Sequence, residues 1–159
     1  CIMNWDTANS WIDGINTANY LGYSDWRLPT ALNPDGSGPE SGWGDGSEMS
    51  HLFYDELGGI ALNPITTSTD PDLALFSNIQ ILFAYWTSTE VVGNTDYAWF
   101  FIPNNGSLSF GSKEDLVFVL PVRDIPPVPE PTTITLLGIG LAGLGGSCLR
   151  RRREQKADT

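Results

Sequence analysis

The feature that most constrains this chain is an uncharged stretch at residues 132–149, where only Thr, Ser and Cys interrupt the apolar residues and glycines. As a helix, 18 residues would extend about 27 Å, close to the thickness of a bilayer core. Four arginines, Arg150–Arg153, follow at once, and a helix buried in a soluble domain would not end in such a block. The pattern predicts a single transmembrane helix at 132–149 with a basic cytoplasmic tail at 150–159 and the rest of the chain outside.

A stiff proline-rich linker, IPPVPEP at residues 125–131, precedes this stretch. The order of a Pro-Glu-Pro triplet, an apolar helix and a basic cluster resembles the PEP-CTERM sorting signal of Gram-negative, exopolysaccharide-producing bacteria. The resemblance implies processing near the triplet by an exosortase. It also implies transient anchoring in the inner membrane, then release to the cell surface or extracellular matrix. The sorting residues would be Pro129, Glu130, Pro131, Arg150, Arg151, Arg152 and Arg153.

The chain begins at Cys1, without an initiator Met or a leader of charged and then apolar residues. We therefore expect it to be part of a longer precursor with an export signal upstream. Met3 as a true start is the alternative. Cys1 and Cys148 are the two cysteines, so residues 1–131 cannot close an internal disulfide and cysteine usage says little about the redox compartment.

Charge is distributed unevenly along the chain. Residues 1–131 carry three basic and 17 acidic side chains, a net charge of −14, whereas residues 132–159 carry five basic and two acidic ones, a net charge of +3. Binding to nucleic acid needs clustered Lys and Arg against the phosphates. The acidic part therefore argues against a nucleic-acid partner and indicates a soluble, self-repelling surface.

Two helices are predicted in the first half. Residues 4–16 have apolar side chains at helical spacing with Asn4 as N-cap, and the pattern predicts that Trp5 and Trp11 both pack inward. Ser47 is expected to cap a second helix at 48–57. The stretch DWRLPT before it is expected to be extended, because Pro29 disfavours helix at Leu28.

Between these elements, residues 31–47 hold five glycines and two prolines, which predicts a long loop. From residue 85 the apolar period becomes that of strands. The strands are expected in YWTSTE, DYAWFFIP, SLSFGS and LVFVLPVRD, and Asn105-Gly106 is a type I′ hairpin signal. Helices followed by an antiparallel meander make an α+β domain.

The order NWDTANSW, DWRLPT, GSEMSHLFYDEL, YWTSTE, AWFF with NNGS, and LPVRD resembles the Lcl C-terminal domain family (DUF1566) over about residues 3–124. The resemblance implies a C-type-lectin-like fold at residues 1–124, with two helices beside a small antiparallel sheet. It also implies extracellular display and, in some members, glycan binding. Two departures stand out: the usual first strand is expected to be missing, and the loop GPESGWGDG lacks the cysteines of some relatives, so other contacts must hold it or it moves.

RLPT also resembles a motif of sulfatase-modifying enzymes, but these depend on paired cysteines, which residues 1–131 lack. His51 is the single histidine, and no nucleophile stands at a recognisable spacing from it. We expect a structural or solvent-facing His51, no enzyme activity and no catalytic residue. Arg27 and Arg123 are each expected to pair with a buried carboxylate.

Candidate ligand-binding residues lie in or beside the glycine-rich loop. Trp43 is expected to be an exposed aromatic that could stack on a sugar, whereas Trp86 and Trp99 fit a core better. The acids Asp35, Glu40, Asp45 and Glu48 could gather around Ca²⁺ or form a hydrated acidic loop, so no cofactor or metal ligand is assigned. The leading hypothesis is a lectin-like domain that binds glycans or matrix components of a biofilm. The alternative is a structural or adhesive surface protein without a small-molecule ligand.

Overall fold

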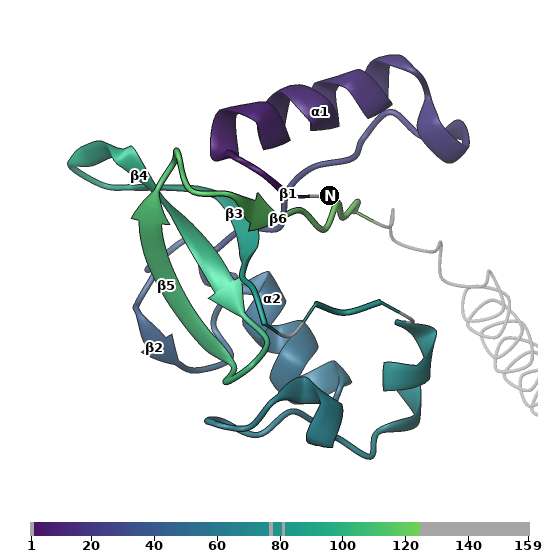
Figure 1. Ribbon diagram of the computed structural model, residues 1–159, viewed down its shortest axis with the longest axis vertical. Coiled ribbons are helices and arrows are strands. Elements are labelled where there is room, and N and C mark those ends of the chain that lie inside the picture. Colours follow the sequence, from purple (N-terminus) through teal and green to yellow (C-terminus); the bar gives the residue numbers. More distant parts are fainter. Residues whose placement is uncertain (1, 77, 81, 125–159) are drawn as a thin grey trace, which may run out of the picture. The chain divides into compact units, whose positions relative to one another are not determined.

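The computed structural model of the chain describes residues 2–76, 78–80 and 82–124 (Figure 1). These residues form an α+β domain with two helices and a six-stranded sheet in the order β1-β6-β3-β4-β5-β2. The predicted linker, transmembrane helix and basic tail (125–159) lie outside the described residues. Within the described part of the chain, no helix is both long and apolar enough to cross a membrane.

Helix α1 (Trp5–Thr17) begins as predicted, because the Asn4 side chain accepts a hydrogen bond from the Thr7 backbone N–H at 2.9 Å. Ala8 and Ile12 are buried on its inner face. Trp5 packs beside them and donates its ring N–H to the Thr87 carbonyl at 2.8 Å.

The prediction that Trp11 packs inward is wrong, because its side chain is 37% exposed. At roughly 100° of rotation per residue, Trp11 falls beyond the edge of the stripe formed by Trp5, Ala8 and Ile12.

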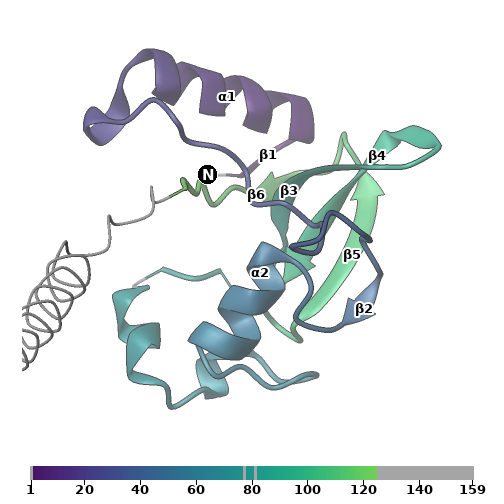
Figure 2. The same cartoon turned by 180° about the vertical axis from the view of Figure 1, so that it is seen from behind.

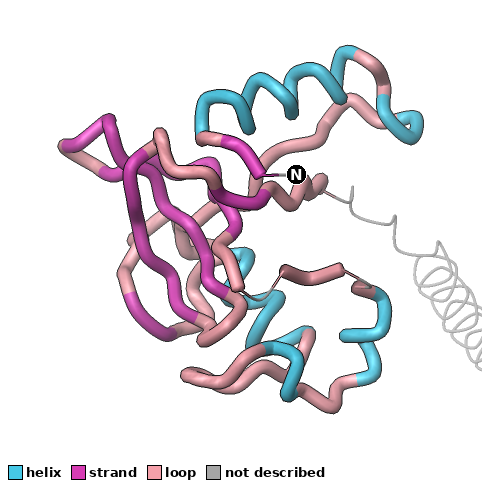
Figure 3. Tube along the Cα trace, in the orientation of Figure 1, coloured by secondary structure: helices cyan, strands magenta, loops and turns pink. Residues whose placement is uncertain are grey.

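Helix α2 (Glu48–His51) continues directly into a π-helical turn, η2 (Leu52–Glu56). The predicted cap is confirmed, because Ser47 Oγ accepts the Ser50 backbone N–H at 3.1 Å. The segment between η2 and the sheet carries two short 3-10 turns, Ile65–Thr67 and Pro71–Leu75 (Figure 3). A third, Tyr20–Gly22, follows α1.

The central meander is as predicted. Strands β3 (Tyr85–Val91), β4 (Asn94–Ile102) and β5 (Ser107–Ser112) pair antiparallel in sequence order. The expectation that the whole sheet is antiparallel is wrong, because β6 (Val117–Phe118) pairs parallel to β3. After β5 the chain crosses to the edge of β3 that faces away from β4, where Phe118 pairs with Tyr85.

Two short strands complete the edges. The expected loss of the first strand is wrong, since β1 (Ile2–Met3) pairs antiparallel with β6. At the opposite edge β2 (Gly42–Trp43), within the predicted loop, pairs antiparallel with β5. Each of these strands has two residues, too few to show an alternating pattern.

The β4–β5 hairpin is confirmed, but its predicted type I′ turn is wrong. Such a turn needs positive φ at both central residues. Here Gly106 has φ +74°, whereas Asn105 is not among the described residues with positive φ. The loop spans residues 103–106 between the paired Ile102 and Ser107, and Pro103 restricts its start to negative φ. Glycine is also required for space, because a Cβ at Gly106 would lie 2.6 Å from Phe53.

The centre of the sheet is buried on both faces, which explains the successive apolar residues Tyr85-Trp86 of β3 and residues 98–102 of β4. Tyr85 and Trp99 belong to one core cluster with residues of α2 and η2, and Trp86 and Ala98 to another with residues of α1. The two helices lie well apart in both views (Figures 1 and 2), each over its own cluster. Trp86 and Trp99 are buried, as predicted. Both clusters lie within residues 1–123, which form one compact unit.

Candidate functional site

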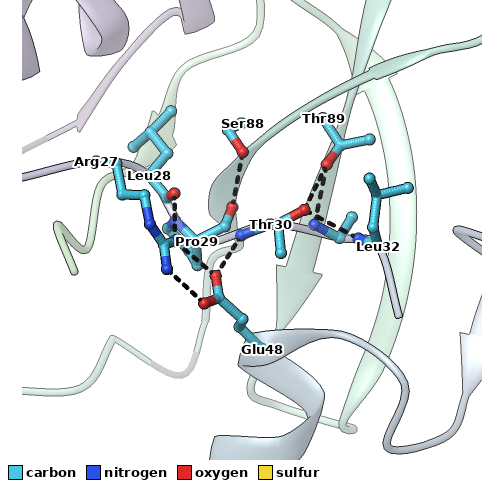
Figure 4. Close-up of polar contacts among 9 residues, drawn as sticks. Arg27, Leu28, Pro29, Thr30, Leu32, Glu48, Ser88 and Thr89 are labelled. Carbon is cyan, nitrogen blue, oxygen red and sulfur yellow. Dashed lines mark hydrogen bonds and ion pairs between the residues drawn. The ribbon is translucent and has the colours of Figure 1, made fainter. Parts of the chain in front are cut away.

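The RLPT stretch is tied to the start of α2 by Glu48 (Figure 4). The Arg27 guanidinium donates from its two terminal nitrogens to the two Glu48 carboxylate oxygens, at 2.8 and 2.7 Å. The Thr30 backbone N–H donates to Glu48 Oε2 at 2.6 Å. Both oxygens of Glu48, a predicted ligand residue, therefore already accept hydrogen bonds from the protein.

A second set of contacts joins RLPT to strand β3 (Figure 4). The Ser88 backbone N–H donates to the Pro29 carbonyl at 2.8 Å. The Thr89 hydroxyl lies 3.3 Å from the Thr30 hydroxyl and accepts the Ala31 backbone N–H at 3.0 Å. DWRLPT and YWTSTE, far apart in sequence, thus form one hydrogen-bonded framework from which the loop at 31–47 departs.

Arg123 makes the other predicted ion pair, with Asp25. Its Nε and Nη2 donate to the two carboxylate oxygens at 3.1 and 3.2 Å, and its guanidinium carbon lies 3.6 Å from the centre of the Tyr23 ring. The Arg123 hydrogen bond lowers the pKa of Asp25 from its ordinary value. The expectation of buried carboxylates is wrong for both pairs, since the side chains of Asp25 and Glu48 are 51% and 38% exposed. Desolvating a charged pair is costly, and an exposed carboxylate avoids that cost.

The loop at 31–47 begins with a turn stabilised by its own side chains. Asp35 Oδ1 accepts the Ser37 hydroxyl at 2.6 Å and the Ser37 backbone N–H at 2.9 Å. These hydrogen bonds, the hydroxyl first, lower the pKa of Asp35. The Asn33 side-chain amide donates to Ser37 Oγ at 2.9 Å. Asp35 is therefore an ionised carboxylate held in place.

The far end of the loop packs on the same asparagine. A Cβ at Gly46 would lie 1.9 Å from Asn33 Oδ1, so only glycine fits there without displacing that side chain. Pairing between β2 and β5 holds the middle of the loop. Hydrogen bonds and close packing therefore hold the loop that lacks cysteines.

Trp43 lies on β2 with its side chain at the surface. It is 55% exposed, as predicted. Its ring N–H donates to the Asn105 carbonyl at 3.1 Å, and its backbone is paired with Ser107 on β5. The indole is thus fixed at its nitrogen edge while over half of its surface remains open to solvent.

A surface hollow of about 660 Å³ lies beside Trp43 and contains most of the predicted ligand residues. Asp35, Glu40 and Asp45 line it together with Trp43, whereas Glu48 lines an adjacent hollow. The structure therefore brings three of the four candidate acids and the candidate aromatic to one place. Within residues 2–76, 78–80 and 82–124, no cluster of His, Cys, Asp and Glu has the arrangement that would hold a metal ion.

His51 lines the same hollow and is solvent-facing, as predicted, with a side chain 58% exposed. Its Nδ1 lies 2.7 Å from an Asp55 oxygen and its Nε2 3.4 Å from a Glu56 oxygen. Sequence reasoning missed this cluster. The spacing of four between His51 and Asp55 could have indicated it, whereas Glu56, five residues on, faces His51 because the chain is π-helical there.

Residues 127–153 match the PEP-CTERM protein-sorting motif. No curated protein and no solved structure matches the chain. The motif falls where the linker, apolar stretch and arginines were predicted, and outside the described residues. It indicates an exported surface protein that an exosortase processes after transient anchoring in the membrane.

Proposed function

We propose that this chain is an exosortase-sorted surface or biofilm-matrix protein whose domain binds glycans or other matrix components in the hollow beside Trp43. The observation that carries the proposal is the Trp43 indole, which is 55% exposed yet fixed by its hydrogen bond to Asn105. A large aromatic ring that needs no ordering on binding offers apolar contact area at low entropic cost.

The hollow supplies hydrogen-bond acceptors as well as this ring. The carboxylates of Asp35, Glu40 and Asp45 line it, and carboxylates accept hydrogen bonds from hydroxyl groups more strongly than neutral oxygens do. An aromatic face beside several acceptors suits a sugar, which presents apolar C–H faces and hydroxyl donors. The negative lining favours a neutral or amino sugar over an acidic polysaccharide.

The resemblance to the Lcl C-terminal domain family supports a lectin-like assignment, and the framework between DWRLPT and YWTSTE gives its motif residues a shared structural role. The loop acids, all of them among the described residues, do not form a metal site by themselves, so Ca²⁺ is tested only as an ion that the sugar and a loop carboxylate would hold together. We propose binding without catalysis. Both ring nitrogens of His51 face carboxylates, at 2.7 and 3.4 Å, an arrangement that orients the imidazole toward its own helix.

A glycan array probed with residues 1–131, with Ca²⁺ or with a chelator, tests the proposal. Trp43→Ala removes the stacking face, and we expect binding to neutral or amino glycans to weaken about tenfold or more, a loss of roughly 1.4 kcal/mol. Trp11→Ala is the matched control, because Trp11 is also an exposed tryptophan but lies on α1, away from the hollow. Loss in both variants, or in neither, would contradict a site at Trp43.

The array also separates the alternative function. A wild-type protein that binds no glycan under either condition would favour a structural or adhesive surface protein without a small-molecule ligand.

A further inference from the structure

A second cavity, partly open to solvent, is lined by residues of α2 and η2. Its volume is about 230 Å³. Its walls come from α2, η2, the 3-10 turn at 65–67, residues 76, 78 and 79, and the sheet. Met49, Phe53, Ile65, Tyr85 and Phe101 are among its lining residues, and each is at most 6% exposed.

The lining is apolar, and none of its described residues is charged. Its polar groups are the Asn78 side chain and the Tyr85 hydroxyl, which already accepts the Gln80 backbone N–H at 2.8 Å. A charged ligand would lose its hydration here without gaining an ionic partner. The chemistry of the walls therefore selects a neutral, mainly apolar molecule.

The volume sets the size of that molecule. The cavity has a volume of about 230 Å³. An apolar cavity of about 150 Å³ stays dry and binds benzene. Scaling by volume gives room for a ligand of roughly nine non-hydrogen atoms.

Access and local geometry both support a binding site. The deep walls are buried, whereas Asn78 is exposed and Leu52, Phe76, Ile79 and Leu120 are half-buried, so the cavity opens to solvent beside these side chains. Leu52 and Phe53 in the wall belong to the π-helical turn η2. Single π turns within helices occur often at functional sites.

We propose that this cavity is a binding site for a small neutral apolar molecule, such as an aromatic ring or a short aliphatic chain. It is separate from the hollow at Trp43. Met49, Leu52 and Phe53 line the cavity, whereas Ser50 and His51 of the same helical segment line the hollow. This proposal is independent of the proposed glycan site, and an absence of glycan binding would not contradict it.

Methyl-resolved NMR on the full chain in detergent micelles, titrated with benzene and separately with benzoate, tests the site. We expect benzene to shift the methyl signals of Met49 and Ile65 in a saturable way. Ile60, which is 64% exposed and outside the cavity lining, is the control for shifts that do not come from the cavity. Benzoate has the same ring with a carboxylate, and we expect no saturable shift with it.

Leu120 lines the cavity, and the larger side chain in Leu120→Phe reduces its volume. We expect this variant to bind benzene at least tenfold more weakly than the wild type does. Leu116→Phe makes the same change at a residue that is 66% exposed and should leave binding unchanged. If benzene at saturation leaves Met49 and Ile65 unshifted in the wild-type chain, the site does not exist. Equal binding of benzene and benzoate, or equal benzene affinity in the Leu120 and Leu116 variants, would also overturn the proposal.

Discussion

Replacing Glu48 tests whether this residue holds the two motif stretches together. In the structure it accepts hydrogen bonds from both terminal nitrogens of Arg27 and from the Thr30 backbone N–H. It also stands at the first position of α2, where a negative charge is favoured. The Arg27 and Glu48 side chains are 35% and 38% exposed, so solvent screens their attraction in part.

The loss of stability expected on replacing Glu48 can be estimated from these three interactions. The solvent-screened bidentate ion pair with Arg27 contributes about 1 kcal/mol, and the hydrogen bond from the Thr30 N–H about 1 kcal/mol. The negative charge at the N-terminus of α2 contributes about 0.5 kcal/mol. We expect Glu48→Ala to lower the free energy of unfolding by about 2–3 kcal/mol. Glu48→Gln keeps an acceptor for Thr30 but removes the charge from the ion pair and from the helix end, and should lose about 1.5 kcal/mol.

Urea unfolding followed by tryptophan fluorescence measures these values, since Trp86 and Trp99 are buried. Glu114→Ala, an exposed acid outside the framework, is the control and should change stability by less than about 0.5 kcal/mol. A double-mutant cycle with Arg27→Ala should give a coupling of about 1 kcal/mol. If Glu48→Ala costs no more than the control, or if the coupling is zero, the reasoning about this framework is refuted.

Three further results are expected. Gly46→Ala should push the Asn33 amide aside, since the new Cβ would lie 1.9 Å from its oxygen, and should lower stability by about 1–2 kcal/mol; urea unfolding at wild-type level would contradict this close packing. The pKa of Asp35, lowered from 3.8 by Ser37, means that its ionised form stabilises the fold above pH 3.8, an effect lost as the pH falls through the folded-state pKa. An NMR titration should show that low pKa in the wild type and a return toward 3.8 in Ser37→Ala, and identical titrations would contradict the assigned cause. Glu130→Ala in the sorting motif should leave unprocessed protein in the membrane fraction of the source cells, whereas protein of normal processed size on an immunoblot would refute a role for this residue.

The local elements of the fold could be predicted from neighbouring residues. Asn4 and Ser47 cap their helices as expected, and the three central strands follow their apolar runs. Caps and periodic patterns act over a few residues, so a single sequence displays them. The sorting motif is also a linear signal, and it was predicted from the order of its three parts.

The site could be predicted only in part. The exposure of Trp43 could be predicted from its glycine-rich surroundings. Which of the acids line the hollow and which bind other parts of the protein depends on partners distant in sequence. Asp35 lies in the hollow, whereas Glu48 instead holds Arg27 and Thr30. Both are acids in or beside one glycine-rich loop, and only the folded chain distinguishes them.

By itself, the sequence determined the exported acidic domain, its helices, its central meander and the sorting signal, because each rests on composition or on short-range pattern. The tertiary structure decided the rest. It placed the two-residue strands β1 and β2 at opposite edges, turned β6 parallel to β3 and brought Glu56 beside His51 through a π turn. These features depend on contacts between segments or on a local change of helix geometry, neither of which leaves a periodic trace in the sequence.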